Sequence, residues 1–236
     1  MKVVHRILGA VSGIAMLAVL LITSFEIGAY SSYGWYEKEY EKYDVFTDLE
    51  MENPDVMKVT TEMMAYLRGD RKDLEVPTIV NGKEREFFND REKAHMEDVQ
   101  KLFLGGLWVR RGAVLLLLAV IAVIVRTKAD WKTLLPKSFL YVLGSFMVIT
   151  LGAGLLFLSD FNKYFTIFHE IFFDNDLWLL DPRTDLLIRM LPEGFFLDMV
   201  VRIGLLFLSM LIALSAISIV FLIRQRKNVR TQQNVL

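Results

Sequence analysis

Two histidines are the side chains of this 236-residue sequence best suited to chemistry. His95 lies in a charged segment and His169 in an aromatic one, whereas the third histidine, His5, is close to the N-terminus. Because the unperturbed pKa of an imidazole is about 6.5, the ring accepts a proton at neutral pH and returns it, as acyl transfer by general acid–base catalysis requires. The alternative for each ring is a structural histidine, hydrogen-bonded within the protein.

Other kinds of reactive site are missing from the sequence. The chain has no Cys, which excludes disulfides, zinc–thiolate sites and a cysteine nucleophile. His169-Glu170 begins like the zinc-binding pattern H-E-x-x-H, but Phe173 stands where the second histidine is needed, so no metal is expected. There is no G-x-S-x-G, S-x-x-K or glycine-rich phosphate loop, and no basic face with interleaved aromatic residues to bind nucleic acid. No cofactor is expected.

The elements that must position the histidines include four long apolar stretches. Hydrophobic residues make up 54% of the chain and occur in blocks of about the 20 residues that cross a bilayer. Three blocks are free of charge, and the fourth extends back through Arg110 and Arg111. These arginines are read either as anchors that snorkel to the interface or as a functional pair reaching a lipid headgroup or carbonyl. Residues 1–236 therefore form a single membrane domain, with spans at about 7–29, 107–126, 137–159 and 200–223.

The distribution of charge predicts the orientation. Lys and Arg residues cluster at positions 2–6, 126–137 and 224–230, which all fall on one side of the four spans. By the positive-inside rule both termini are cytoplasmic. The other side receives residues 30–106 and 160–199, with 26 acidic residues against 14 basic ones. These two segments are expected to form an extracellular cap.

The first cap segment predicts short helices and a hairpin. Asn53-Pro54 begins an amphipathic helix that Gly69 ends, and Asn81-Gly82 is typical of a two-residue hairpin turn. Asn89 or Asp90 then caps a helix that carries His95 toward the membrane. The charged run 37–42 is expected to be a solvated extension of the first span. The fold class is mainly α, integral membrane, with four transmembrane helices and a cap of short helices and a small β-hairpin.

The second cap segment is dominated by aromatic side chains around His169. Residues 161–173 are expected to lie at the outer membrane interface, where aromatic residues gather. Two carboxylates are candidates to orient a histidine by accepting its second ring N–H: Asp98, three residues after His95, and Asp176. The candidates for an aromatic pocket are Phe165, Phe168, Phe172 and Phe173.

Three strings of the sequence resemble a known family. They are F-F-N-D-R-E-K-A-H-M-E-D-V at 87–99, F-H-E-I-F-F-D-N-D-L-W-L-L-D-P at 168–182 and L-P-E-G-F-F at 191–196. With the length and the four spans, they resemble the lipoprotein intramolecular transacylase (Lit) family of Gram-positive bacteria over nearly the whole chain. The resemblance implies a plasma-membrane enzyme with an extracellular cap and two catalytic histidines, which correspond here to His95 and His169.

The resemblance also implies a reaction and a substrate. The family moves the sn-2 acyl chain of a diacylglyceryl lipoprotein to the α-amine of its own N-terminal Cys, giving the lyso-form lipoprotein. One histidine would deprotonate the amine and the other would protonate the departing glycerol oxygen, in an order that the residues do not assign. The partners expected are the lipoprotein substrate and membrane lipid. On position alone, the candidates to bind substrate or the oxyanion are Asn175, Trp178, Arg110 and Arg111.

Two other functions remain as alternatives. A non-catalytic membrane adaptor or sensor would use the cap to bind a partner, with both histidines structural or pH-responsive. A small transporter is disfavoured, because apart from Arg110 and Arg111 the spans lack buried charge and show no repeated halves.

Overall fold

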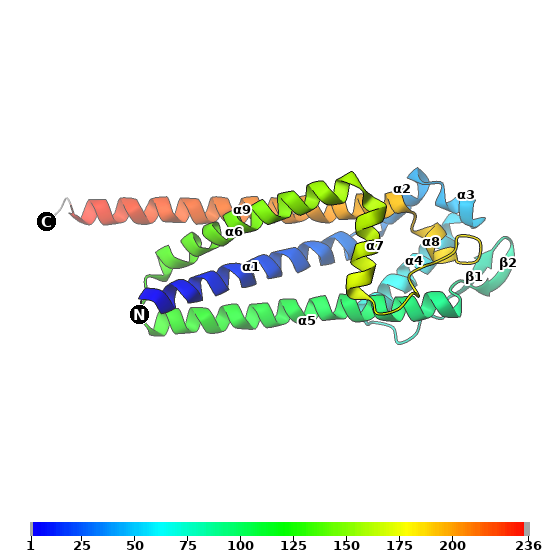
Figure 1. Ribbon diagram of the computed structural model, residues 1–236, viewed down its shortest axis with the longest axis horizontal. Coiled ribbons are helices and arrows are strands. Elements are labelled where there is room, and N and C mark those ends of the chain that lie inside the picture. Colours follow the sequence, from blue (N-terminus) through cyan, green and yellow to red (C-terminus); the bar gives the residue numbers. More distant parts are fainter. Residues whose placement is uncertain (1, 234–236) are drawn as a thin grey trace. The chain divides into compact units, whose positions relative to one another are not determined.

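The computed structural model describes residues 2–233, apart from the side chains at positions 2, 153, 154, 156–159, 161 and 228–233. Within this part the chain is helical except for one antiparallel hairpin (Figure 1). The elements in chain order are α1 (Lys2–Tyr30), α2 (Tyr33–Lys42), α3 (Val45–Leu49), α4 (Asn53–Arg68), β1 (Pro77–Val80), β2 (Lys83–Glu86), α5 (Asp90–Arg126), α6 (Trp131–Ser159), α7 (Phe161–Phe172), α8 (Leu186–Met190) and α9 (Glu193–Gln233).

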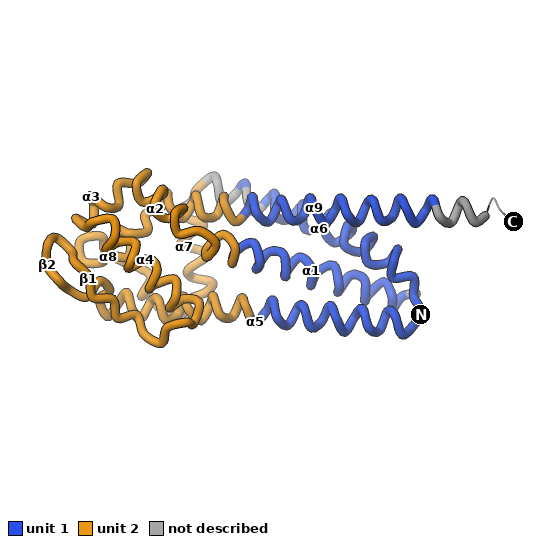
Figure 2. Tube along the Cα trace, turned by 180° about the vertical axis from the view of Figure 1, so that it is seen from behind, with its two compact units in different colours: residues 1–25, 108–159, 204–236 blue, residues 26–107, 160–203 orange. Residues whose placement is uncertain are grey.

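The chain divides into two compact units, shown in different colours in Figure 2. One comprises residues 1–25, 108–159 and 204–236 and is called the spanning unit. The other comprises residues 26–107 and 160–203, contains both His95 and His169, and is called the histidine unit. The helices α1, α5 and α9 each contribute residues to both units. All but one of the 28 acidic residues of the chain belong to the histidine unit.

Four helices are long and apolar enough to cross a membrane, as the sequence predicts. In the described residues these candidate spans are Val3–Tyr30, Asp90–Arg126, Trp131–Gly152 and Glu193–Lys227. Large apolar side chains on them are exposed, among them Val148 at 75% and Ile149 at 71%. Such surfaces are stable in contact with lipid and unstable in water, so the chain is a multi-pass membrane protein.

Helix packing in the spanning unit depends on small residues. Gly9 and Gly13 of α1 face α6, where a Cβ at position 9 would overlap the hydroxyl of Ser138 and one at position 13 would lie 2.8 Å from Val142 Cγ2. Close approach through glycines four residues apart is a common means of packing helices in lipid. A small apolar core completes the unit, formed by Leu17, Phe139, Phe207 and Leu211.

The histidine unit confirms the predicted hairpin and amphipathic helix. Strands β1 and β2 pair with Val80 opposite Lys83, and Asn81 and Gly82 both adopt positive φ, at 49° and 68°. The helix α4 has a proline in its first turn and ends at Gly69, which adopts a φ of 85°. Its buried face is formed by Val56, Val59, Met63, Met64 and Leu67.

The charged run 37–42 differs from the prediction. It belongs to α2, which is separated from the first span by a break at residues 31–32. Tyr36 and Tyr40, on one face of α2, are 2% and 0% exposed and pack on Phe195 at ring distances of 5.5 and 5.7 Å. The prediction of a solvated extension was wrong, because the charged residues occupy only the outer face of α2. Aromatic residues four positions apart form the opposite face, which is buried.

Candidate active site

The two histidines of the histidine unit lie side by side. His95 lies near the start of α5 and His169 near the end of α7, and their ring centroids are 6.1 Å apart with the planes inclined by 36°. Each residue is only 7% exposed. Two rings 74 positions apart in sequence are thus brought within reach of one small substrate group.

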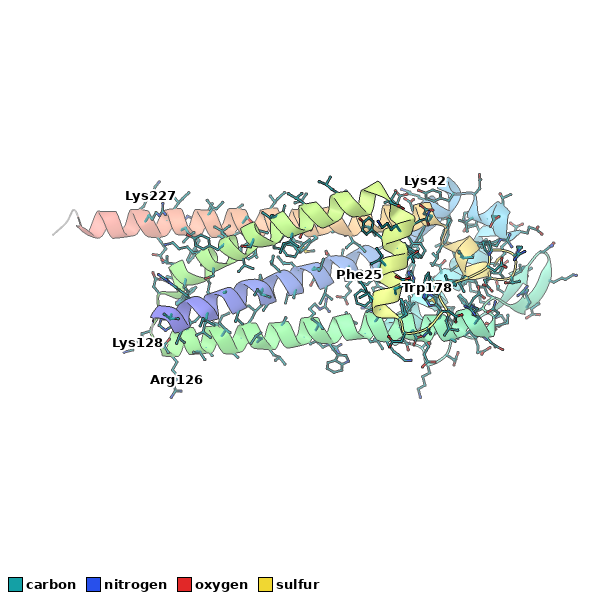
Figure 3. The ribbon with its side chains drawn as sticks, viewed as in Figure 1. Phe25, Lys42, Arg126, Lys128, Trp178 and Lys227 are labelled. Atoms are coloured by element: carbon teal, nitrogen blue, oxygen red, sulfur yellow. The ribbon has the colours of Figure 1, made fainter. Side chains whose placement is uncertain are left out.

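Aromatic rings surround His169. The Trp178 ring stacks on the imidazole at 4.8 Å and 27°, and Phe165 lies 4.2 Å from it. Phe173, which is buried, contacts both imidazoles, at 5.5 Å from His95 and 5.4 Å from His169. Figure 3 labels Trp178, which follows α7 in the chain. The pair is therefore held in an apolar environment that excludes much of the surrounding water.

A backbone carbonyl fixes the orientation of His169. Its Nδ1 atom lies 2.8 Å from the carbonyl oxygen of Phe165, one helical turn earlier. A carbonyl only accepts, so Nδ1 donates the hydrogen and, in the neutral ring, the lone pair is on Nε2. From the sequence, only carboxylates were candidates for this role. No sequence motif shows that a main-chain carbonyl will accept the hydrogen bond of a histidine.

The environment keeps both rings neutral at neutral pH. Burial, together with the nearby His169, lowers the pKa of His95 to about 4, although the carboxylate of Asp98 acts in the opposite direction. Burial also lowers the pKa of His169, and the hydrogen bond to Phe165 opposes this shift. Both rings lie outside the apolar parts of the membrane-spanning helices. His95 is among charged residues in the first turns of α5, and His169 is in α7, which follows α6. A neutral imidazole is a base ready to accept a proton.

The Nδ1 atom of His95 is a buried polar atom that forms no hydrogen bond within the part of the chain that the structure describes. A buried polar atom without a partner costs about 1–3 kcal/mol of stability. Such atoms are rare outside functional sites, where a ligand completes the hydrogen bonding. This feature singles out His95 from an ordinary core histidine.

Two polar contacts connect α5 to the segment after α7, on either side of His95. Four residues before His95, the Arg91 guanidinium donates to the carbonyl of Asp176 and lies 3.6 Å from its carboxylate. Three residues after it, Asp98 Oδ2 accepts from Asn175 Nδ2 at 2.8 Å. We call these two contacts the clamp. The clamped segment, residues 173–178, begins and ends with the Phe173 and Trp178 rings that contact the histidines.

The clamp gives Asn175 and the two aspartates different roles from those expected. Both ends of the Asn175 amide are engaged, since Oδ1 also accepts from the backbone N–H of Leu177 at 3.1 Å. The remaining oxygen of Asp98 accepts from Lys101 at 3.0 Å. The hydrogen bond from Asn175 lowers the pKa of Asp98, which stays ionised. In the described residues, these three side chains hold the segment in place instead of bonding to an imidazole.

A second network fixes the start of α5. Asn89 and Glu92 form a reciprocal cap, in which Glu92 N donates to Asn89 Oδ1 at 2.9 Å and Asn89 N donates to Glu92 Oε2 at 2.7 Å. The other Glu92 oxygen accepts from the backbone N–H of Leu187 at 2.6 Å, and Asn89 donates to the buried carboxylate of Asp185 at 2.7 Å. Burial raises the pKa of Glu92. These hydrogen bonds fix the backbone of the first turn of α5, and so the position of His95 one turn later.

Arg91, Glu92 and Asp185 also support the site, and sequence reasoning did not single them out. The Asn89-x-x-Glu92 spacing is a capping signal that could have identified Glu92. No local pattern identifies Arg91 or Asp185, whose partners are distant in sequence. Phe165 also gains an unexpected neighbour, because it packs at 5.5 Å on Phe196 of the L-P-E-G-F-F string.

The remaining candidates fall into two groups. Phe168 and Phe172 are 39% and 53% exposed and form, with the 68% exposed Ile171, an apolar face of α7 next to His169. Arg110 and Arg111 belong to the spanning unit, where the Arg111 guanidinium lies over the Trp108 ring at 4.8 Å. Within the described residues, no group of three or more His, Asp and Glu side chains is arranged to hold a metal ion.

The chain matches known proteins over most of its length. The family model described as "Lipoprotein intramolecular transacylase Lit" matches residues 10–196. The structure of the membrane-integral lipoprotein intramolecular transacylase Lit from Bacillus cereus is 18% identical, has a TM-score of 0.81, and covers 96% of this chain and 100% of that one.

Two variants of the Bacillus cereus protein match as well. One has a histidine replaced by alanine and a TM-score of 0.77, the other a histidine replaced by arginine and a TM-score of 0.78; both are 18% identical and cover 96% of this chain, with 97% and 96% of their own. At this identity the likeness establishes the shared fold. No curated protein matches the chain.

Proposed function

Since the chain belongs to the lipoprotein intramolecular transacylase family, we propose that it moves the sn-2 acyl chain of a diacylglyceryl lipoprotein to the α-amine of the lipoprotein's own N-terminal Cys. The amine nitrogen attacks the ester carbonyl carbon, an amide bond forms, and the ester bond to the glycerol oxygen breaks. The product is an isomer of the substrate with an N-acyl group and a free sn-2 hydroxyl. The observation that carries the proposal is the pair of buried, neutral imidazoles whose centroids are 6.1 Å apart.

The proton balance of the reaction suits neutral histidines. The attacking amine loses one proton and the departing glycerol oxygen gains one, so no proton is consumed overall. Because both pKa values are lowered, neither ring carries a proton to donate at the start. The proton given to the glycerol oxygen is therefore the one taken from the amine, carried by an imidazole between the two steps.

His169 is the better proton carrier of the two. Its Nδ1–H is bonded to the Phe165 carbonyl, which fixes the ring and stabilises the cation that forms when Nε2 takes a proton. His95 is more strongly desolvated and is suited to a hydrogen bond with the substrate, for which its unpaired Nδ1 is available. The Trp178 indole, which belongs to the histidine unit, remains a candidate for binding the oxyanion.

The substrate's acyl chain would lie along α7. Phe168, Ile171 and Phe172 expose an apolar face beside His169, in a unit whose remaining surface is rich in acidic residues. Amine and ester belong to one molecule, so the main contribution of the protein is to bring them together, which lowers the barrier by several kcal/mol.

A synthetic lipopeptide tests the reaction. Purified protein is incubated with a synthetic diacylglyceryl lipopeptide, and the product is fragmented by mass spectrometry. The intact mass must stay the same, while the N-terminal fragment ion retains one acyl chain only after transfer. If the wild-type protein binds the lipopeptide and leaves its amine free, the proposal fails, and a partner-binding adaptor becomes the reading to pursue.

The proposed orientation in the bacterial plasma membrane places both termini in the cytoplasm and the histidine unit outside. It rests on charge, since all but one of the acidic residues lie in the histidine unit and the spanning unit has twelve basic residues against one acidic residue. The lack of cysteine makes the test clean. A cysteine at Lys83 should react with an impermeant maleimide on intact cells and one at Lys227 should not; the reverse pattern would invert the topology.

A further inference from the structure

A cavity of about 650 Å³ opens in the spanning unit, apart from the histidines. It lies between α1 and α6, where α6 begins, and its lining is polar on one side. The polar residues that line it are His5, Arg6, Asp130, Thr133, Lys137, Ser138 and Tyr141. All of its lining residues belong to the spanning unit, whereas both histidines of the proposed site belong to the histidine unit.

The polar side of the cavity favours an anion. Arg6 and Lys137 supply two positive charges, and the first turn of α6 adds the positive end of its helix dipole. The single carboxylate, Asp130, is turned to a structural role, because its Oδ1 accepts from the backbone N–H of Thr133 at 3.3 Å and caps α6. His5 is held by a hydrogen bond of 3.1 Å between its Nε2 atom and Thr127 Oγ1.

The other side of the cavity is apolar. Ala10, Leu134 and Val142 line it, next to the place where Gly9 and Gly13 let α1 approach α6 closely. These residues belong to helices long and apolar enough to cross the membrane, so we expect this side to face lipid. A ligand that fits both sides has an anionic head and a hydrocarbon tail.

We propose that this cavity binds an anionic phospholipid, with the phosphate held by Arg6 and Lys137 and an acyl chain along Ala10 and Val142. Basic pockets between membrane helices are suited to such headgroups, which combine negative charge with two chains in the surrounding leaflet. The bound lipid would brace α1 against α6 at the end of the bundle where Gly9 and Gly13 let the two helices meet closely.

The simplest competing explanation is that the basic residues at this end only set the topology. Figure 3 shows Arg126, Lys128 and Lys227 at the same end of the spanning unit, and none of the three lines the cavity. They attract any anionic surface by charge alone. The cavity residues differ from these three because Arg6 and Lys137 lie beside an apolar wall. If charge alone attracts the lipid, both groups of basic residues should matter equally; if the cavity binds it, only the cavity residues should.

Native mass spectrometry of the full-length protein in detergent separates them. Wild-type protein should retain one dioleoyl phosphatidylglycerol in preference to phosphatidylcholine with the same chains. The double variant Arg6→Gln with Lys137→Gln should lose about 25-fold in affinity, from about fivefold per basic residue. The matched control, Arg126→Gln with Lys128→Gln, removes the same charge from the same end and should retain the lipid. Equal loss in both pairs would overturn the proposal.

Two further arms test the apolar wall and the source of the phosphate. Ala10→Phe fills the apolar side and keeps every charge, so it should weaken phosphatidylglycerol binding by about tenfold or more while the melting temperature without lipid stays within a few degrees. Unchanged lipid affinity in a folded Ala10→Phe variant would contradict the proposal. Inorganic phosphate at millimolar concentration should not displace the lipid; displacement would point to a free-phosphate site and also overturn it.

Discussion

In the spanning unit helices meet through glycines and a small apolar core, whereas in the histidine unit buried carboxylates are held by hydrogen bonds from side chains and from the backbone. The spanning unit turns large apolar side chains such as Val148 outward. The histidine unit buries Glu92 and Asp185 at 1% and 4% exposure and satisfies their carboxylates with backbone and side-chain N–H groups.

The difference follows from what each unit must do. A helix in lipid already satisfies its own backbone, so packing needs only close contact. A site for proton transfer must hold two rings at a fixed distance against thermal motion, which takes directional hydrogen bonds on several sides. The comparison predicts that polar substitutions will affect catalysis in the histidine unit, and that steric ones will affect stability in either unit.

The largest effect is expected from the histidines themselves. His95→Ala and His169→Ala should each lower transfer by about 10²-fold or more, because each removes a group from the proton-transfer step or its substrate contact. His5→Ala is the matched control, since His5 bonds to Thr127 within the spanning unit and its loss should leave turnover unchanged. The lipopeptide assay measures all three, with melting temperatures to verify folding. A fully active His169→Ala variant would remove it from the mechanism.

The clamp should give the next largest effect. Asn175→Ala frees the segment that carries Phe173 and Trp178 and should lower kcat by about tenfold, with a smaller change in KM, because the groups are misplaced and not lost. Asp98→Ala should match it, and the double variant should be no worse than either single one. Lys101→Ala, which removes only the exposed partner of Asp98, should change little. Additive losses in the double variant would contradict a shared contact.

Glycine substitutions compare packing in the two units. Gly9→Ala in the spanning unit meets Ser138, and Gly194→Ala in the histidine unit meets the Tyr43 ring, so each should destabilise its unit by about 1–3 kcal/mol. Gly112→Ala, which has no neighbour within 4 Å, should be neutral or stabilising, because alanine favours helix. Thermal unfolding in detergent measures all three. A destabilised Gly112→Ala variant would mean that glycine is needed there for another reason.

The smallest effect concerns pH. The neutral imidazoles are lost only as pH falls through their lowered pKa values, which lie below the usual 6.5 and at about 4 for His95. The substrate α-amine, with a pKa of about 8, must also be neutral. The pH profile of kcat/KM should therefore rise to about pH 8 with no separate limb near 6.5. An additional rise of kcat/KM near pH 6.5 would mean that a histidine keeps its ordinary pKa, and so that water reaches the imidazoles more freely than their burial indicates.

The sequence alone determined the features that depend on local pattern. Four apolar blocks determined the four helices, Asn81-Gly82 determined the hairpin turn, and Asn53-Pro54 with Gly69 determined the limits of α4 within one residue. These are properties of the chain within about 20 residues, where periodicity and turn residues act. The strings around His95 and His169 likewise sufficed for the family, which the match over residues 10–196 establishes.

Tertiary structure decided everything about the site that joins distant residues. Only the fold brings His95 to His169, directs Asn175 to Asp98 and Arg91 to Asp176, and selects a main-chain carbonyl to orient His169. From the sequence, Asp98 and Asp176 could be named only as candidate partners of a histidine, because a carboxylate has the same local sequence whichever partner it meets. Which donor reaches which acceptor is decided by the packing of α5, α7 and the segment after α7, and that packing is a property of the whole unit.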